Sequence, residues 1–146
     1  MNRNFINRFK FRAWSPQLAT MTIPLEYNEE FITLQGAILM QSTGICDKNH
    51  KLIYEGDILL LPDILEDGNL PAAVVFKNGA FGVSISEATG GLYKRFYSFD
   101  EFDELFNEIA DDCFKEIENI GNIFENPDKI PEKDVEYIQK KYFDLQ

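Results

Sequence analysis

The stretch that decides the fold is residues 39–58, LMQSTGICDKNHKLIYEGDI. Its pattern predicts a strand, a polar turn, a short apolar step, a second turn and then another strand. Gly44 and Gly56 can adopt backbone angles that other residues reach only at a cost. Asp47 and Asp57 carry carboxylates that can accept hydrogen bonds from nearby backbone amides and so fix turns. The stretch is rich in structural information, and within it we find no nucleophile–base pair, metal-ligand spacing or phosphate loop.

The same stretch resembles the signature of the YopX family, whose members are small phage and prophage proteins. The family's central motif reads roughly QyTGLkDkNGkeIYEGDI, and residues 41–49 and 53–58 follow it. Two further segments match in the same order. Residues 9–14 resemble the family's N-terminal kFRaWD, and residues 120–127 resemble its C-terminal IGNIyENPeL. Three ordered matches are more specific than any one of them alone.

The resemblance spans residues 9–127 and departs from the family's pattern at two positions. Ser15 stands where the family usually has Asp, and His50 stands where it usually has Gly. The motif residues for which we expect structural roles are Trp14, Gly44, Asp47, Tyr54, Glu55, Gly56, Asp57, Gly121, Asn122, Glu125, Asn126 and Pro127. The resemblance implies a mainly β fold, a small and partly open SH3-like barrel, and it implies no established activity.

The composition predicts one domain with a substantial core. The 146 residues include thirteen Phe, six Tyr and one Trp, and each aromatic side chain buries roughly 150–250 Å². A chain of this length can bury a core of its own. We therefore expect a single YopX-like domain over residues 1–146, with a barrel core at about 9–127 and a helical tail at about 128–146.

The sequence predicts a protein of the bacterial cytoplasm. No apolar run approaches the roughly 20 residues that cross a bilayer, and residues 1–5 lack the apolar stretch of a secretory signal. Cys46 and Cys113 lie far apart without a CxxC or Cys/His spacing. This pattern indicates two free thiols in a reducing compartment.

Charge is spread unevenly along the chain. The net charge is −11; residues 1–54 carry a balance of +2 and residues 55–146 a balance of −13. A non-specific DNA binder needs several Lys and Arg facing phosphates, and most of this chain would repel them. We therefore do not expect nucleic acid as a partner.

The basic N-terminal segment allows two interpretations. Phe9 and Phe11 alternate with Lys10 and Arg12, and this period of two predicts a strand with one buried face. With Arg3, Arg8, Lys10 and Arg12, the outward face could be a patch for phosphate. The other interpretation, which we favour, is an edge strand whose outward charges discourage pairing with other edges.

Further elements follow from local signals. Strands are expected at residues 20–23, 31–34, 38–40, 58–61, 72–76, 80–85, 92–97 and 117–124. Pro62 is expected to end one strand before an acidic loop over 63–71, and Asn78-Gly79 predicts a hairpin turn. Ser98 and Glu101 form a capping box, which predicts an inserted amphipathic helix over roughly 99–110. Pro131 predicts the start of a C-terminal helix.

Candidate chemical sites all have simpler structural explanations. The acidic run over residues 100–112 lacks the Gly that a calcium loop of the EF-hand type requires. Asp47, Glu55 and Asp57 could be paired carboxylates for acid–base work, but their turn positions explain them better. His50 is the only histidine, and a single His without a second ligand is a weak metal candidate. We therefore expect no catalytic residue, no cofactor and no metal.

The leading functional hypothesis is a non-catalytic, phage- or prophage-encoded interaction protein that self-associates. Small barrels leave strand edges, and pairing edges between copies is one way to satisfy them. Two alternatives remain open: an acidic decoy that mimics nucleic acid and occupies a host DNA-binding protein, and a weak nucleic-acid binder that uses the basic N-terminal strand. The expected partners are a second copy of the chain and an unidentified protein, with no membrane. An enzyme is the last of the possibilities.

Overall fold

The fold is known from a computed structural model, which describes residues 10–25, 36–65, 68–96, 106 and 109–143. These residues form two open sheets and one long helix, so the mainly β prediction is confirmed. The SH3-like arrangement of the barrel stays a prediction. Within the described part of the chain, no helix combines the length and the hydropathy that crossing a membrane requires.

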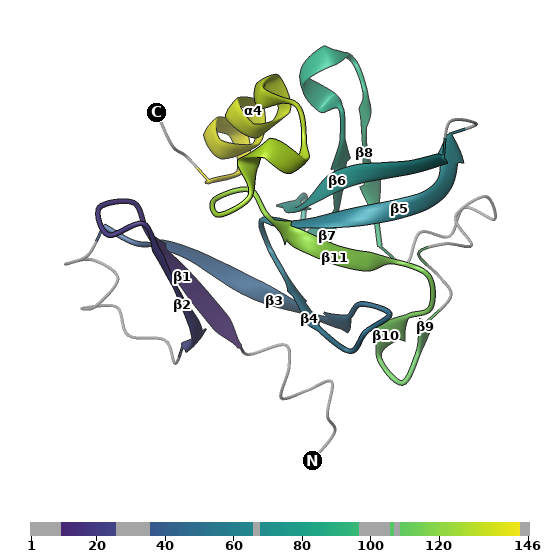
Figure 1. The fold of residues 1–146 in the computed structure, drawn as a ribbon, viewed down its shortest axis with the longest axis horizontal. Coiled ribbons are helices and arrows are strands. Elements are labelled where there is room, and N and C mark those ends of the chain that lie inside the picture. The colour runs from purple at the N-terminus through teal and green to yellow at the C-terminus, as the bar shows by residue number, and fades with distance from the viewer. Residues whose placement is uncertain (1–9, 26–35, 66–67, 97–105, 107–108, 144–146) are drawn as a thin grey trace.

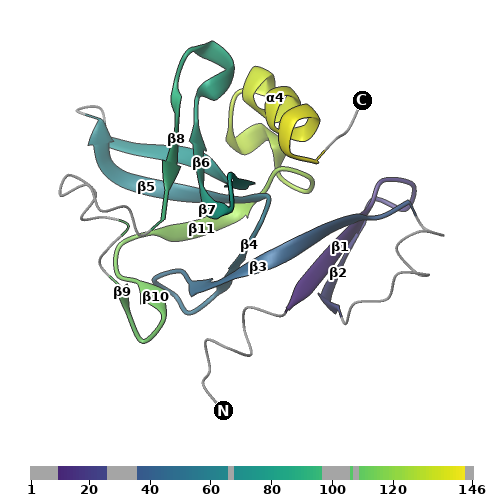
Figure 2. The same ribbon diagram turned by 180° about the vertical axis from the view of Figure 1, so that it is seen from behind.

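The first sheet has the strand order β2-β1-β3-β10-β9, and β4 pairs with β3 off this path. Its strands are β1 (Phe11–Ser15), β2 (Thr20–Leu25), β3 (Ile38–Cys46), β4 (Leu52–Tyr54), β9 (Ile109–Ala110) and β10 (Cys113–Phe114). All pairs are antiparallel except β3 with β10, which is parallel. The first half of β3 and the β1–β2 hairpin extend away from the second sheet (Figures 1 and 2). We call this part the arm.

The second sheet is antiparallel, with the order β11-β5-β6-β7-β8. Its strands are β5 (Asp57–Leu65), β6 (Gly68–Lys77), β7 (Ala80–Ile85), β8 (Leu92–Arg95) and β11 (Glu118–Asn122). The short 3-10 helices are η1 (Glu87–Thr89) and η2 (Pro127–Lys129), and the long helix is α4 (Glu132–Phe143). Helix α4 begins directly after Pro131 and packs beside β6 (Figure 1). The expected C-terminal helix is thus confirmed.

Two apolar clusters cover opposite faces of the second sheet. Neighbouring residues of β6 show this, because Val74 belongs to one cluster and Val75 to the other. Side chains alternate between the faces of a strand, so a central strand such as β6 must be apolar on both. The first cluster also contains Phe96, Phe106 and Phe114, whose rings contact one another. The second cluster lies under α4.

The hairpin turn at Asn78-Gly79 is confirmed. Asn78 and Gly79 have φ angles of 52° and 81°, and they join β6 to β7 as the sequence predicts. Positive φ at both central residues is the geometry that Asn-Gly favours.

The predicted loop over residues 63–71 is wrong. Strand β5 continues past Pro62 to Leu65, and β6 begins at Gly68. Pro62 follows the last residue of β5 that pairs with β11, and Pro71 precedes the first residue of β6 that pairs with β7. Each proline therefore has a neighbouring strand on one side only, where its missing N–H breaks no ladder.

The inserted helix over 99–110 falls mostly outside the described residues, as do its capping residues and the strand expected at 31–34. Phe106 is described and is buried. Ile109 and Ala110 form β9 rather than the end of a helix, and they pair antiparallel with β10. The helical prediction is therefore wrong for these two residues, which sheet pairing holds in an extended conformation.

The assignment of the N-terminal strand to a sheet edge is also wrong. Strand β1 lies between β2 and β3 and pairs with both. Arg12 is only 3% exposed, although the alternation with Phe11 had placed it on the outward face. Both Arg12 and Ala13 are buried because both faces of β1 are covered at this point.

Candidate functional site

Several signature residues meet at the turn between β4 and β5, which the Arg12 side chain of β1 contacts. We call this the polar junction: Arg12, Asp47, Tyr54, Glu55, Gly56, Asp57 and Asn119. At its centre Arg12 Nη1 lies 2.7 Å from Asp57 Oδ1, and both side chains are almost fully buried. Arg12 also donates through Nη2 to the Glu55 carbonyl oxygen at 2.8 Å, and its guanidinium lies over the Tyr54 ring, 5.0 Å from the ring centre. The planar fork of arginine suits such combined pairing and stacking.

Asp57 is bonded at both carboxylate oxygens. Besides Arg12 at Oδ1, its Oδ2 accepts the Tyr54 N–H at 2.8 Å and the Asn119 side-chain amide at 2.7 Å. Burial raises the pKa of the Asp57 carboxyl above its usual value, and attraction to Arg12 offsets only part of the rise. The carboxylate thus closes the turn, as expected, and also ties it to β1 and β11.

Asp47 closes the preceding turn in the same way and also binds β11. Its Oδ1 accepts the N–H groups of Asn49 and Lys51, both at 2.9 Å. Its Oδ2 accepts the backbone N–H of Asn119 at 2.8 Å. Asn119 therefore links both aspartates, and the two turns of the organising stretch share one anchor on β11.

Glu55 and Gly56 complete the junction. Glu55 Oε1 accepts the Gln41 N–H at 2.8 Å, and burial is the main reason that the pKa of Glu55 is raised. Gly56 has a φ of 85°, and a Cβ there would lie 3.1 Å from Met40 Sδ. Its N–H donates to the Val74 carbonyl at 2.8 Å. Only glycine combines this backbone angle with this close approach.

The C-terminal part of the signature forms a separate turn. Asn122 Oδ1 accepts the N–H groups of Phe124 and Glu125, and its Nδ2 donates to Glu125 Oε1 at 2.9 Å. Asn126 Oδ1 accepts the Asn122 N–H at 3.1 Å. A Cβ at Gly121, where φ is 146°, would collide with the Asn126 side chain.

Three further motif residues lie outside these two turns: Trp14, Gly44 and Pro127. Trp14 stacks on Phe124 with ring centres 5.8 Å apart, which joins the arm to the C-terminal turn. Pro127 begins η2. Gly44 lies inside β3, within the register irregularity between Ser42 and Cys46.

The chemistry of this arrangement is structural. The carboxylates of Asp47, Glu55 and Asp57 accept hydrogen bonds from the protein's own amides or from Arg12. Among the described residues, no group of three or more His, Cys, Asp or Glu side chains is arranged to hold a metal ion. Arg12 Nε is the one junction atom in this part of the chain that is buried without a hydrogen-bond partner.

Sequence reasoning missed Arg12 and Asn119 as junction residues. Arg12 was assigned to an outward basic face because of simple alternation along one strand. Asn119 carried a usable signal, since a polar side chain in the middle of a buried strand needs a partner. The sequence could not identify the partners of Arg12 and Asn119, because Asp47 and Asp57 lie far from both residues in the chain.

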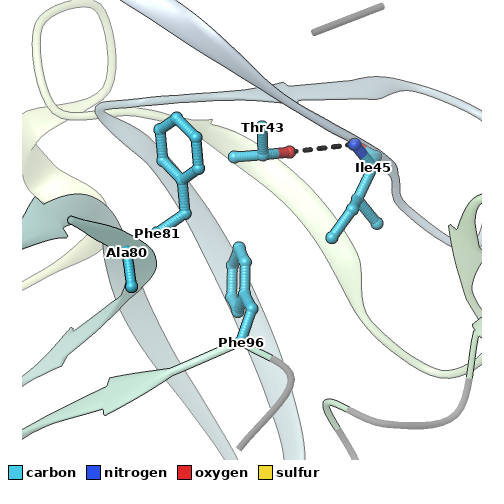
Figure 3. A pocket seen from close by; sticks show the side chains of 5 residues that line it. All are labelled: Thr43, Ile45, Ala80, Phe81 and Phe96. Carbon is cyan, nitrogen blue, oxygen red and sulfur yellow. Dashed lines mark hydrogen bonds between the residues drawn. The ribbon is translucent and has the colours of Figure 1, made fainter. Parts of the chain in front are cut away.

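An apolar hollow lies between β3, β7 and Phe96. It has a volume of about 180 Å³ and is lined by Thr43, Ile45, Ala80, Phe81 and Phe96 (Figure 3). The rings of Phe81 and Phe96 face it, and the Thr43 hydroxyl oxygen accepts the Ile45 N–H at 3.1 Å (Figure 3). Phe76, which is 46% exposed, contacts Phe81 edge-on with ring centres 4.9 Å apart. This lining offers apolar contact and no titratable group.

A second, more open hollow of about 570 Å³ lies at the start of α4. Its lining residues are Pro127, Asp128, Ile130, Glu132, Val135 and Glu136. Acidic side chains surround an apolar floor there.

Comparisons with known proteins agree with the signature. A family model described as YopX protein matches residues 21–131, which include the central and C-terminal motifs. The crystal structure of protein yopX from Bacillus subtilis is similar, with a TM-score of 0.50 and 16% identity, covering 85% of this chain and 99% of that one. Protein EF1440 from Enterococcus faecalis gives a TM-score of 0.49 and 21% identity, covering 81% of this chain and 94% of that one. At these identities the structural likeness concerns the fold alone, and a search of curated proteins found no match.

Proposed function

The chain belongs to the YopX family, and on this premise we propose that it is a non-catalytic interaction protein, encoded by a phage or prophage, that self-associates. The observation that carries the non-catalytic part of the proposal is the polar junction. Its aspartates and Glu55 use their oxygens to hold the protein's own turns together. A catalytic carboxylate needs an oxygen within reach of a substrate proton. Both oxygens of Asp47 and of Asp57, and Oε1 of Glu55, already bind groups of the protein.

The apolar hollow and the exposed Phe76 support contact with another protein. Large aromatic side chains at the surface are enriched in protein interfaces. Phe76 stands at the exposed end of the first core cluster, beside Phe81 of the hollow. We assign this surface to the contact between two copies of the chain.

Light scattering on the purified protein at micromolar concentration tests self-association. The expected mass is a multiple of the 16.9 kDa chain. Phe76→Ser should shift the mass towards that of one chain. Leu18→Ser is the matched control, because it removes a side chain that is 65% exposed but lies in the β1–β2 turn. A parent that scatters as a single chain contradicts the self-association.

The structure weakens the alternative of a nucleic-acid binder. Arg12 belongs to the basic N-terminal segment, but its guanidinium is buried and paired with Asp57. It cannot contact phosphate without breaking that pair. Anisotropy titration with a random duplex at physiological salt should show weak or no binding, and submicromolar binding would favour this alternative.

The acidic-decoy alternative rests on the net charge of −11. A strongly acidic surface attracts the basic clefts of DNA-binding proteins. Host proteins can be retained on the immobilised chain, eluted with rising salt and identified by mass spectrometry. This experiment distinguishes an acidic decoy from a protein that only self-associates. DNA-binding proteins that elute early in the salt gradient would support the decoy.

A further inference from the structure

The fold brings the two cysteines together. Cys113 of β10 and Cys46 of β3 are direct partners in the parallel pairing of these strands. The Cys46 N–H donates to the Asp112 carbonyl at 2.8 Å, which holds the two backbones side by side. Paired strands lie about 4.8 Å apart, and disulfides join residues whose Cα atoms are about 4.4–6.8 Å apart. The backbone spacing therefore suits a disulfide.

Both thiols also lie on the same side of the sheet. Ile45 and Phe114, their neighbours in the two strands, belong to the first core cluster. Successive side chains of a strand point to opposite faces. Cys46 and Cys113 thus face away from that cluster together. Both are buried, and no disulfide joins them in this structure.

An imidazole lies next to one of the thiols. His50 Nδ1 is 3.3 Å from Cys113 Sγ, within hydrogen-bonding distance for sulfur. His50 itself is exposed in the turn that Asp47 holds. It has a φ of 65°, an angle that glycine adopts without strain. His50 therefore has an unfavourable backbone angle for a non-glycine residue, and its imidazole lies beside Cys113.

We infer that Cys46 and Cys113 form a reversible thiol–disulfide pair and that His50 is the base that activates Cys113. The neighbouring strands supply the geometry, and the exposed imidazole connects the buried thiol to solvent. The thiolate, not the thiol, is the reactive nucleophile, so a neighbouring proton acceptor sets the reactivity of Cys113. This activity is independent of the proposed self-association.

The oxidant is a hydroperoxide. His50 takes the proton of the Cys113 thiol, and the thiolate attacks one peroxide oxygen. The O–O bond breaks, a sulfenic acid forms on Cys113, and the leaving hydroxide takes the imidazolium proton to give water. The Cys46 sulfur then attacks the sulfenic sulfur, the S–S bond forms, and the S–O bond breaks with release of a second water. Two thiols and one hydrogen peroxide become one disulfide and two waters.

The disulfide would fasten β10 to β3. These strands share a single pair of Cα partners, so their backbone connection is short. A covalent bond between residues far apart in the sequence restricts the unfolded chain and raises stability. Oxidation thus should raise the melting temperature, and a dithiol should reverse the rise.

Mass spectrometry of the intact chain after treatment with hydrogen peroxide tests the pairing. The expected result is a loss of about 2 Da, the two thiol hydrogens, together with loss of both alkylation sites and recovery of both with dithiothreitol. Cys46→Ser should stop at the sulfenic acid, which dimedone traps on Cys113. A disulfide between chains, or oxygen addition without an S–S bond in the parent, overturns the inference.

Substitution of His50 tests its role. Asn tolerates positive φ better than most residues, so His50→Asn should melt close to the parent while disulfide formation slows about a hundredfold, the low end for a positioned base. His50→Gly is the second variant, since it relieves the backbone angle and should melt no lower than the parent. An oxidation rate in either variant equal to that of the parent overturns the assignment of His50.

Discussion

Two turn glycines of this protein have similar φ angles and very different surroundings. Gly56 in the polar junction has a φ of 85°, and Gly79 in the β6–β7 hairpin has a φ of 81°. A Cβ on Gly56 would meet Met40, Arg12 and Phe124, whereas a Cβ on Gly79 would meet nothing within 4 Å. The backbone demand at the two positions is alike, so the difference in their importance comes from packing. The junction turn is where the arm, β5 and the C-terminal turn meet, and the hairpin turn serves only its own two strands.

The largest effect is expected from breaking the ion pair of the junction. Asp57→Asn leaves the buried Arg12 cation without its carboxylate, and Arg12→Met leaves the carboxylate without its cation. Removing one partner of a buried pair costs about 3–5 kcal/mol of unfolding free energy. Denaturant melts of both variants measure this. An amide oxygen at residue 57 could still accept the Tyr54 N–H, so the turn by itself would tolerate Asp57→Asn and the expected loss comes from the ion pair.

The double variant and a surface pair are the controls for this prediction. Arg12→Met with Asp57→Asn should cost less than the sum of the two single changes, because no charge is left buried alone. Lys48→Ala breaks a half-exposed ion pair with Glu118 and should cost less than about 1 kcal/mol. Single variants as mild as Lys48→Ala would show that the junction does not depend on the pair.

The direct test of the comparison is the same substitution at both glycines. Gly79→Val should cost about 1–2 kcal/mol through backbone strain alone. Gly56→Val adds crowding against Met40 Sδ, 3.1 Å from the added Cβ, and should cost about 2–5 kcal/mol in total. Thermal or denaturant melts decide the matter. Equal losses at the two positions would mean that packing around Gly56 adds nothing.

The smallest effect is expected at Glu55 and depends on pH. Burial raises the pKa of its carboxyl in the folded protein, so folding favours the protonated form. That contribution is complete below the ordinary pKa of 4.5 and is lost as the pH rises through the raised value. Glu55→Gln stays neutral and can still accept the Gln41 N–H. It should therefore melt above the parent at pH 7, and this advantage should shrink towards pH 4; a parent that is more stable at pH 7 contradicts the sign.

The sequence predicted the turns of the polar junction better than the contacts that join these turns to distant strands. Asp47 and Asp57 accept the backbone amides of their own turns, as their positions indicated. The same aspartates also bond Asn119, and Asp57 pairs with Arg12, which no local pattern revealed. The prolines of β5 and β6 show the same limit. The sequence predicts that Pro62 ends a strand and that Pro71 lies in a loop over residues 63–71, and only the sheet order shows that each proline has an open side.

By itself, the sequence determined the elements whose hydrogen bonds join near neighbours. The Asn78-Gly79 hairpin, the aspartate-held turns and the helix after Pro131 follow from the φ preferences and side-chain oxygens of a few adjacent residues. Only the tertiary structure decided that Arg12 is buried against Asp57 and that Cys46 lies beside Cys113 and His50. These contacts join strands that are distant in the chain. Their partners are set by sheet order and register, which depend on how all the strands bury their apolar faces together.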